Sequence, residues 1–212
     1  MTGIGECHDA WVWPIAARKR DILNAAEYAA TERLRDGRAL HIRALRPSDR
    51  EGLLAAFERT SNQTRYQRFF APKKTLTELE LDHATHVDFV NQVALAALLQ
   101  EEDGCQTLAG SARYVVAEPG CAELAFTVDD PHQNLGIGTH LMRHLILIAA
   151  AAGLRELSAE VLSDNTPMLK LFERSGLSMN IRHHAGVASV RLNLSHTNQD
   201  KNLKTEICNI GQ

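Results

Sequence analysis

The sequence predicts a mixed α/β domain in which helices flank a central sheet, and three observations lead to this class. Alternating apolar residues, as in CAELAFTV over 121–128, are typical of a half-buried strand. After a turn with two glycines, Leu141, Leu145 and Ile148 recur at helical spacing. Strand-like and helix-like segments then alternate along the chain, which favours a sheet covered by helices.

The individual elements follow in chain order. RKRDILNAAEYAATERL, over 18–34, predicts an amphipathic helix with Ile22, Ala25, Ala26 and Ala29 on one side. Strands are expected at 38–45, 92–99, 107–116, 121–128, 154–162, 177–182 and 186–194. Further helices are expected from Pro47, at 61–70, from Thr75 to about His86, after Gly138, and from Thr166 to Gly176.

The 212 residues divide into three predicted parts. Residues 1–37 form a helical extension, which either packs back on the domain or makes a homodimer contact. Residues 38–195 form one well-cored domain, a size that a single hydrophobic core supports. Residues 196–212 are a polar tail and are expected to be mobile.

Composition argues against several kinds of partner. A net charge of −3 makes nucleic acid a poor partner. The longest apolar run, LILIAAAAG over 145–153, is far below the ~20 residues that span a bilayer, so no membrane partner is expected. Cys7, Cys105, Cys121 and Cys208 show no C-x-x-C pairing, and no secretory signal is visible. Reduced thiols and a cytoplasmic location are therefore expected.

Residues 128–142, VDDPHQNLGIGTHLM, predict an anion-binding turn. Val128 closes a strand, and Gly136 and Gly138 leave two positions without side chains where a helix begins. The first N–H groups of a helix lack partners inside it and lie at the positive end of its dipole, so a phosphate is the expected guest. A dinucleotide fingerprint would need a third glycine where Leu141 stands, and a P-loop would need a lysine after Gly138.

Gln133-x-x-Gly136-x-Gly138 resembles the pyrophosphate loop of the GNAT superfamily of acyl-CoA N-acyltransferases. A second block of that pattern follows, with Asn165 after a strand, then a helix, then Gly176. The resemblance covers about residues 38–193 and implies a mostly antiparallel sheet splayed in the middle, with acetyl-CoA as co-substrate. The cofactor-binding residues that it implies are Phe126, Thr127, Val128, Gln133, Asn134, Leu135, Gly136, Ile137, Gly138, Thr139, Asn165, Met168 and Phe172.

Glu123 is the leading candidate for a catalytic base. A lysine acceptor has a reference pKa near 10.4, so a base must remove its proton before the amine can attack a thioester. Glu123 is a carboxylate in an otherwise apolar strand just before the glycine turn, and burial there would make it a stronger base. The run from Ala122 to Ala125 also resembles the AE-x-A strand in which bacterial protein lysine acetyltransferases of the Pat type place a general base.

The segment SNQTRYQRFF, over 61–70, resembles a Pat-type segment that precedes a short helix and an apolar strand. Tyr66, Phe69 and Phe70 lie at i, i+3 and i+4, a spacing that predicts a hydrophobic stripe anchoring the helix through at least two of them. The resemblance implies that this helix also walls the channel for the acceptor lysine.

Phe172 departs from the family pattern. It stands where many GNAT enzymes have a tyrosine that protonates the departing sulfur, and phenylalanine cannot donate a proton. The acid is therefore unassigned: a water or backbone donor serves, or CoA leaves as the thiolate, which a thiol pKa near 8.5 permits.

The histidines predict no metal site. His83 with His86, and His183 with His184, lack the acidic or cysteine partners that would complete a ligand set. His132 and His140 flank the glycine turn. A surface position is expected for both, and contact with the cofactor's phosphates is the alternative.

Three functions stay open at this stage. The leading one is an acetyl-CoA-dependent N-acetyltransferase that modifies protein lysines. A second is a small-amine acetyltransferase for polyamines or aminoglycosides, and a third is a non-catalytic acyl-CoA sensor. The glycines and Asn165 fit all three, and only Glu123 favours catalysis.

Overall fold

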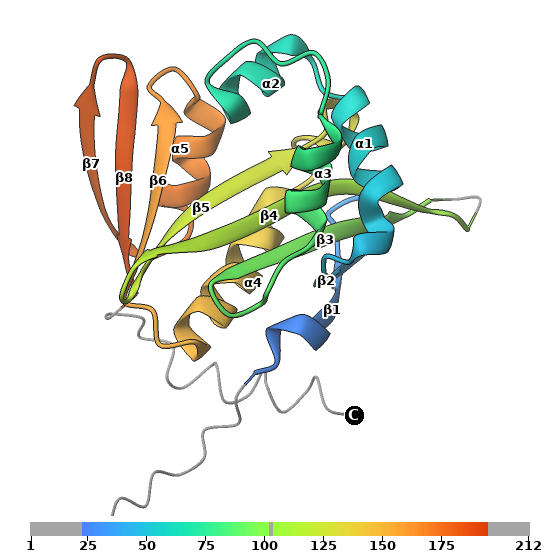
Figure 1. Cartoon of the computed structure of the whole chain (residues 1–212), viewed down its shortest axis with the longest axis horizontal. Helices are drawn as coiled ribbons and strands as arrows, with labels where there is room; N and C mark the ends of the chain where they lie inside the picture. The colour runs from blue at the N-terminus through green and yellow to red at the C-terminus, as the bar shows by residue number, and fades with distance from the viewer. Residues whose placement is uncertain (1–22, 102–103, 195–212) are drawn as a thin grey trace, which may run out of the picture.

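A single eight-stranded sheet forms the centre of the computed structural model, which describes residues 23–101 and 104–194 (Figure 1). The strands are β1 (Ala29–Arg33), β2 (Ala39–Ala44), β3 (Gln92–Gln100), β4 (Gln106–Glu118), β5 (Cys121–Val128), β6 (Glu156–Leu162), β7 (Ser178–His184) and β8 (Val187–Asn193). Their order is β1-β2-β3-β4-β5-β6-β8-β7. All neighbouring pairs are antiparallel except β5 and β6, which run parallel.

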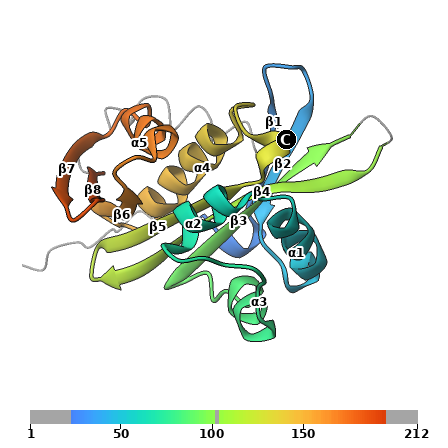
Figure 2. The same ribbon diagram turned by 90° about the horizontal axis from the view of Figure 1, so that it is seen from above.

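Helices cover both faces of the sheet. They are α1 (Arg50–Glu58), α2 (Asn62–Phe69), α3 (Glu78–Thr85), α4 (Ile137–Ala151) and α5 (Thr166–Glu173), with 3-10 turns η1 (Ala25–Glu27), η2 (Pro47–Asp49) and η3 (Asp130–His132). Figure 2 shows α4 and α5 on one side and α1 and α3 on the other. The α4 stripe of Leu141, Leu145 and Ile148 is buried in the larger core, as its spacing predicts. The predicted fold class is confirmed.

The sheet parts at its parallel pair. β5 and β6 are joined only at Cys121↔Glu156, Ala122↔Leu157 and Glu123↔Ser158, although both strands continue for several residues. Beyond Glu123 the two strands separate, and α5 follows the free end of β6 (Figure 1). The sheet is therefore splayed in the middle, as the family resemblance implied.

The N-terminal helix prediction over 18–34 is wrong for the residues that the structure describes. Ala25–Glu27 form a single 3-10 turn, and β1 pairs with β2 from Ala29↔Arg43 to Arg33↔Ala39. Five ladder positions outweigh the helical spacing of three alanines, because strand preference depends on pairing and packing more than on local composition. The expected domain boundary at residue 38 falls between these two paired strands. Residues 1–22 and the predicted tail lie outside the described residues.

The other elements begin and end close to their predicted limits. The clearest shift is α3, expected from Thr75 but starting at Glu78. Thr77 caps this helix by accepting from the backbone N–H of Glu80, while the Glu80 carboxylate accepts from the N–H of Thr77. This reciprocal capping box fixes the first turn.

Candidate functional site

A cleft of about 550 Å³ opens where β5 and β6 separate. It runs between the end of β5, the glycine loop before α4, β6 and α5, with α2 on a further side. The predicted site residues that line it are Glu123, Phe126, Thr127, Val128, Gln133, Asn134, Gly136, Ile137, Gly138, Thr139, Asn165, Met168 and Phe172. Leu135 does not line the cleft; it packs partly buried against the core.

Gly136 shapes one end of the cleft. It is the N-cap residue of α4 with φ +94°, a backbone conformation that favours glycine, and it offers no capping side chain. The first amides of α4 therefore face the cleft at the positive end of a 15-residue helix. Gly138, two residues further on, lies beside the Leu171 side chain. A Cβ on Gly138 would lie 3.5 Å from that side chain.

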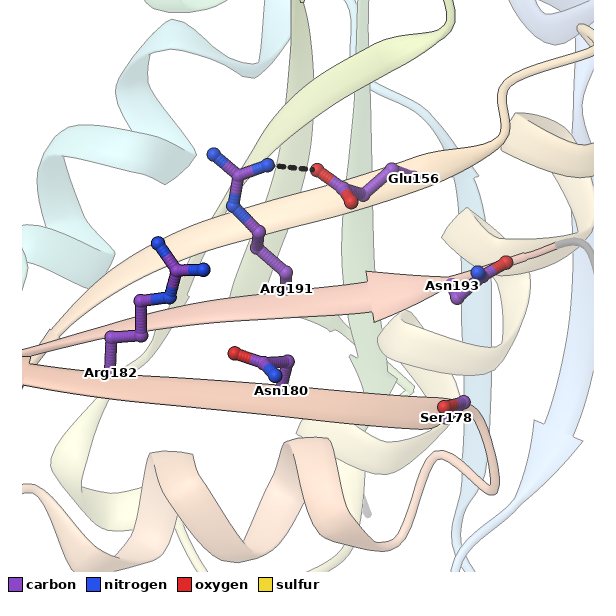
Figure 3. A pocket seen from close by; sticks show the side chains of 6 residues that line it. All are labelled: Glu156, Ser178, Asn180, Arg182, Arg191 and Asn193. Carbon is purple, nitrogen blue, oxygen red and sulfur yellow. Dashed lines mark hydrogen bonds and ion pairs between the residues drawn. The ribbon is translucent and has the colours of Figure 1, made fainter.

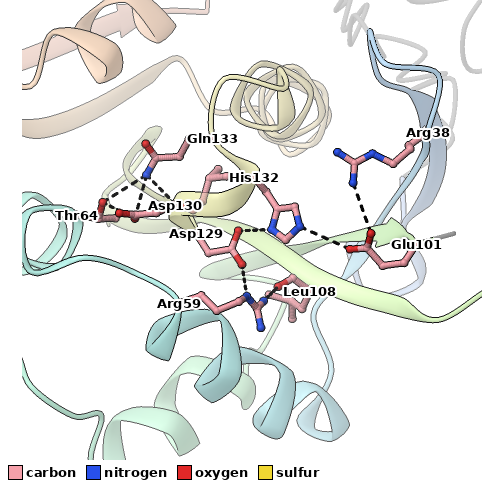
Figure 4. Close-up of polar contacts among 10 residues, drawn as sticks. Arg38, Arg59, Thr64, Glu101, Leu108, Asp129, Asp130, His132 and Gln133 are labelled. Atoms are coloured by element: carbon pink, nitrogen blue, oxygen red, sulfur yellow. Dashed lines mark hydrogen bonds and ion pairs between the residues drawn. The ribbon is translucent and has the colours of Figure 1, made fainter. Parts of the chain in front are cut away.

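Gln133 ties the glycine loop to α2 (Figure 4). Its Nε2 donates at 3.3 Å each to the Val128 carbonyl, to Thr64 Oγ1 and to Asp130 Oδ1. Thr64, on α2, donates in turn to Asp130 Oδ1 at 2.7 Å. The predicted cofactor residue Gln133 therefore holds the loop conformation and connects it to the helix on the other side of the cleft.

Asp129 anchors the start of the same loop through its contacts with Arg59 and His132. Its side chain is fully buried, with Arg59 Nε at 2.6 Å from Oδ2 and His132 Nδ1 at 2.5 Å from Oδ1 (Figure 4). His132 Nε2 lies 3.6 Å from Glu101 Oε1 on the β3–β4 hairpin. The expected surface position of His132 is wrong: its side chain is 12% exposed and lines the cleft, because the Asp129 carboxylate holds it inward.

Glu123 lies where the paired part of β5 ends, and it lines the cleft. The expected burial is wrong: the residue is exposed, because Glu123 alternates with the buried Ala122 and Leu124 and so lies on the other face of β5. A carboxylate in this position remains open to water and to an entering acceptor.

Two arginines share the surroundings of Glu123. Arg68, from α2, lines the same cleft, and Arg113 stands opposite Ala125 on β4 and so on the same sheet face as Glu123. Arg113 donates to Gln92 Oε1 at 3.0 Å, but its buried Nε has no partner in the described part of the chain. Burial lowers the pKa of Arg68, the charge of Arg113 lowers it further, and the Glu123 carboxylate opposes this decrease.

The three aromatic residues at the end of α2 do not pack together against the rest of the protein. Phe69 packs edge-on against Phe57 of α1, with ring centroids 6.1 Å apart. Tyr66 is 43% exposed and Phe70 is 39% exposed, so the expectation that at least two of the three anchor the helix is wrong. Phe70 adopts φ +56° at the C-cap of α2 and lines the cleft.

Asn165 and Phe172 both have structural partners at the α5 side of the cleft. Asn165 Oδ1 accepts from the Met168 backbone N–H at 3.2 Å and so caps α5. Phe172 is 1% exposed and packs edge-on against Phe126 of β5, with centroids 6.2 Å apart. This aromatic pair bridges the gap between the separated halves of the sheet.

Several cleft residues were not predicted from the sequence. They are Arg35, Thr64, Gln67, Arg68, Leu124, Ala125, Ala159, Glu160, Val161, Pro167, Leu171 and Arg174. Those on β5 and β6 lie beside predicted residues, and alternation along these strands could have found some of them. The arginines come from a hairpin tip, from α2 and from the end of α5, which only the folded chain brings together.

A second hollow, of about 350 Å³, lies on β6, β8 and β7 (Figure 3). Its lining is entirely polar: Glu156, Ser178, Asn180, Arg182, Arg191 and Asn193. Arg191 Nη1 bonds Glu156 Oε1 at 3.0 Å. None of the predicted site residues lines this hollow.

Two negative findings apply to residues 23–101 and 104–194. No group of three or more His, Cys, Asp or Glu side chains is placed to hold a metal ion. No helix of this part is both long and apolar enough to cross a membrane.

Comparison with known proteins agrees with this geometry. The model of the acetyltransferase (GNAT) family matches residues 56–177. The acetyltransferase PA5475 of Pseudomonas aeruginosa is 39% identical over 127 residues, which cover 59% of this chain and 68% of that protein. The acetyltransferase Pat of Mycolicibacterium smegmatis is 31% identical over 163 residues, covering 76% of this chain but only 47% of the relative.

Solved structures show the same fold. The GNAT domain of S. lividans PAT superposes with a TM-score of 0.70 at 32% identity, covering 78% of this chain and 96% of that domain. The protein yncA of Salmonella typhimurium, solved with its cofactor acetyl-CoA, gives a TM-score of 0.60 at 18% identity, and the match covers 75% of this chain and 96% of yncA. At that identity the likeness concerns the fold alone. The chain belongs to the GNAT family of acetyltransferases, for which acetyl-CoA is the co-substrate.

Proposed function

We propose that this enzyme acetylates lysine side chains of proteins, with Glu123 as the general base. The observation that carries the proposal is the position of Glu123, in the cleft at the point where β5 and β6 part. The acceptor amine must meet the acetyl group at such a point, between the loop that holds the coenzyme and the helix α2.

The cleft residues fit acetyl-CoA. The left-handed Gly136 and the uncapped first amides of α4 suit a pyrophosphate, because backbone N–H groups can approach its oxygens directly. The cleft continues from this loop along β5 and β6, lined by Phe126 and Val161. The co-substrate supplies an activated acyl carbon, so the protein must bind, orient and exchange protons.

Glu123 would accept the proton of the attacking amine, directly or through a water. An exposed carboxylate suits this role if the acceptor itself covers it on binding. Phe172 is buried against Phe126 and has no proton to give the departing sulfur. A thiol pKa near 8.5 allows the sulfur to leave as a thiolate, so no protein acid is required.

Arg68 and Arg113 favour a singly charged amine over a polycation. They place two guanidinium groups near one carboxylate, and like charges at short range disfavour a further positive group. Polyamines and aminoglycosides carry several cations, whereas a lysine side chain brings one. The apolar ring of Phe70 suits the four-carbon stem of a lysine.

The test replaces Glu123 by glutamine. Glu123→Gln should lower kcat by on the order of 10²–10⁴, the range for one acid–base group, and leave acetyl-CoA affinity unchanged. Glu118→Gln, a matched change at an exposed position of β4, should leave both quantities at their original values. Near-normal turnover in the Glu123 variant would assign the proton transfer to another group.

Acceptor choice is tested with labelled acetyl-CoA. Proteins of a cell lysate, free lysine, spermidine and an aminoglycoside are each offered, and the labelled products are identified. Faster labelling of the polycations than of any protein lysine would refute the acceptor. Tight acetyl-CoA binding without any labelled product would instead indicate a sensor.

A further inference from the structure

The β1–β2 hairpin lies along the first two turns of α4. Glu32 of β1 accepts from His144 Nε2 at 3.0 Å, and its other oxygen lies 3.4 Å from His140 Nδ1. Arg143 also bonds Glu32, and the Tyr28 hydroxyl bonds His144 Nδ1. These contacts clamp the hairpin to the helix.

The clamp also sets the direction of the hairpin. Tyr28 meets α4 at His144, and Glu32 reaches back to His140, so β1 runs towards the N-terminus of the helix. The next residues of the chain form the hairpin turn, beside the loop that precedes α4 (Figure 2). Arg35 in this turn lines the cleft together with Gly136 and Thr139.

Arg35 brings an uncompensated positive charge to this end of the cleft. Its side chain is exposed and, among the described residues, forms no hydrogen bond or ion pair. The neighbouring Asp36 is engaged by Arg38, with 2.8 Å between Nη2 and Oδ2. The first turn of α4 contains no acidic residue, so its dipole and Arg35 add to one positive potential.

We propose that Arg35 binds a phosphate group of acetyl-CoA, which makes the N-terminal hairpin part of the coenzyme site. A guanidinium is well suited to phosphate because it offers several N–H donors in one plane. The residues that match the family model begin at 56, so the hairpin lies outside the matched segment. The inference rests on the coenzyme alone and is independent of the acceptor.

The experiment measures binding by calorimetry for CoA and for dephospho-CoA, which lacks the 3′-phosphate. Arg35→Ala should weaken CoA binding roughly tenfold, the effect of one charge-assisted contact near the surface. Arg182→Ala removes the same charge from an exposed site on β7 and should leave both affinities unchanged.

The two ligands identify which phosphate is bound. If Arg35 contacts the 3′-phosphate, the variant should lose affinity for CoA but not for dephospho-CoA. If it contacts the pyrophosphate, both ligands should weaken by the same factor. Unchanged CoA affinity in Arg35→Ala, or an equal loss in Arg182→Ala, would overturn the proposal. Since only binding is read, an error in the proposed acceptor would not affect the result.

Discussion

Gly136 combines a backbone requirement with a proposed binding role, and the two can be separated by experiment. A Cβ at this residue would meet no atom within 4 Å, so the protein has space for a side chain. Its φ of +94° is unfavourable for a β-branched residue, and the side chain would stand at the mouth of the α4 anion site. The φ requirement of Gly136 should therefore affect stability, and the position of an added side chain should affect binding.

Gly136→Val should lower the free energy of unfolding by about 1–3 kcal/mol and weaken acetyl-CoA binding at least tenfold, on the order of one lost charged contact. Gly153→Val is the matched control, because Gly153 has φ +80° and equally open surroundings but lies beyond the C-terminus of α4. It should cost similar stability without changing affinity. Urea unfolding measures stability, and calorimetry measures affinity. Equal losses of acetyl-CoA affinity in the two variants would show that the glycine loop is not part of the binding site.

At the residue scale, the sequence predicted the site residues that lie close together along the chain. It missed those that the tertiary fold brings together from separate elements. Gly136, Gly138 and Gln133 occur within a single turn, so their spacing alone indicates a phosphate loop. Glu123 could be proposed from its place in a strand. Its neighbours Arg68 and Arg113 could not, because α2 and β4 meet β5 only through the tertiary fold.

At the level of elements, the clamp between β1 and α4 should make stability sensitive to acid. Burial lowers the pKa of His144. Burial alone would raise the pKa of Glu32, but the hydrogen bond and charge of Arg143 lower it overall. Both groups therefore bind protons more readily in the unfolded state. Their contribution is complete above about pH 6.5, the ordinary histidine value, and is lost as the pH falls.

The free energy of unfolding, measured in urea between pH 7.5 and 5, should therefore decrease with acidification, by at most about 1.4 kcal/mol per pH unit for each proton taken up. His144→Gln should flatten the decrease between pH 7 and 5.5, because the contribution of His144 is removed. His140, whose pKa is also lowered by burial, keeps its own contribution. His184→Gln, at an exposed position of β7, should keep the original slope. An identical slope in the His144 variant would show that other groups control the response.

The same clamp explains why β1 was mistaken for a helix. Its alanines suit either structure, and only pairing with β2 and the bonds of Glu32 to α4 select the strand. Elements whose apolar spacing agrees with their buried positions, such as α4, begin and end close to their predicted limits. Edge strands carry a weaker pattern, because one side of the ladder is missing and fewer positions are buried.

For the whole molecule, the coenzyme should join two halves of a sheet that touch at three residue pairs. Acetyl-CoA would contact the glycine loop, β5 and α5 together, so it binds only the folded state. At 100 times its dissociation constant it should add about 2.7 kcal/mol to the free energy of unfolding. Thermal unfolding at increasing acetyl-CoA should show the rise, and Gly136→Val should show a smaller rise at the same concentration. An unchanged melting temperature in the original protein would contradict a site shared by both halves.

The strand order also has a consequence for the order of synthesis. β1 to β5 neighbour one another in the sequence in which they leave the ribosome, so this part of the sheet can form by successive antiparallel pairings. β5 is then an outer edge, open to wrong partners until α4 has been made and has brought β6 alongside. The side of β5 that borders the cleft in the finished protein is therefore, in the nascent chain, an unpaired strand edge until β6 is in place.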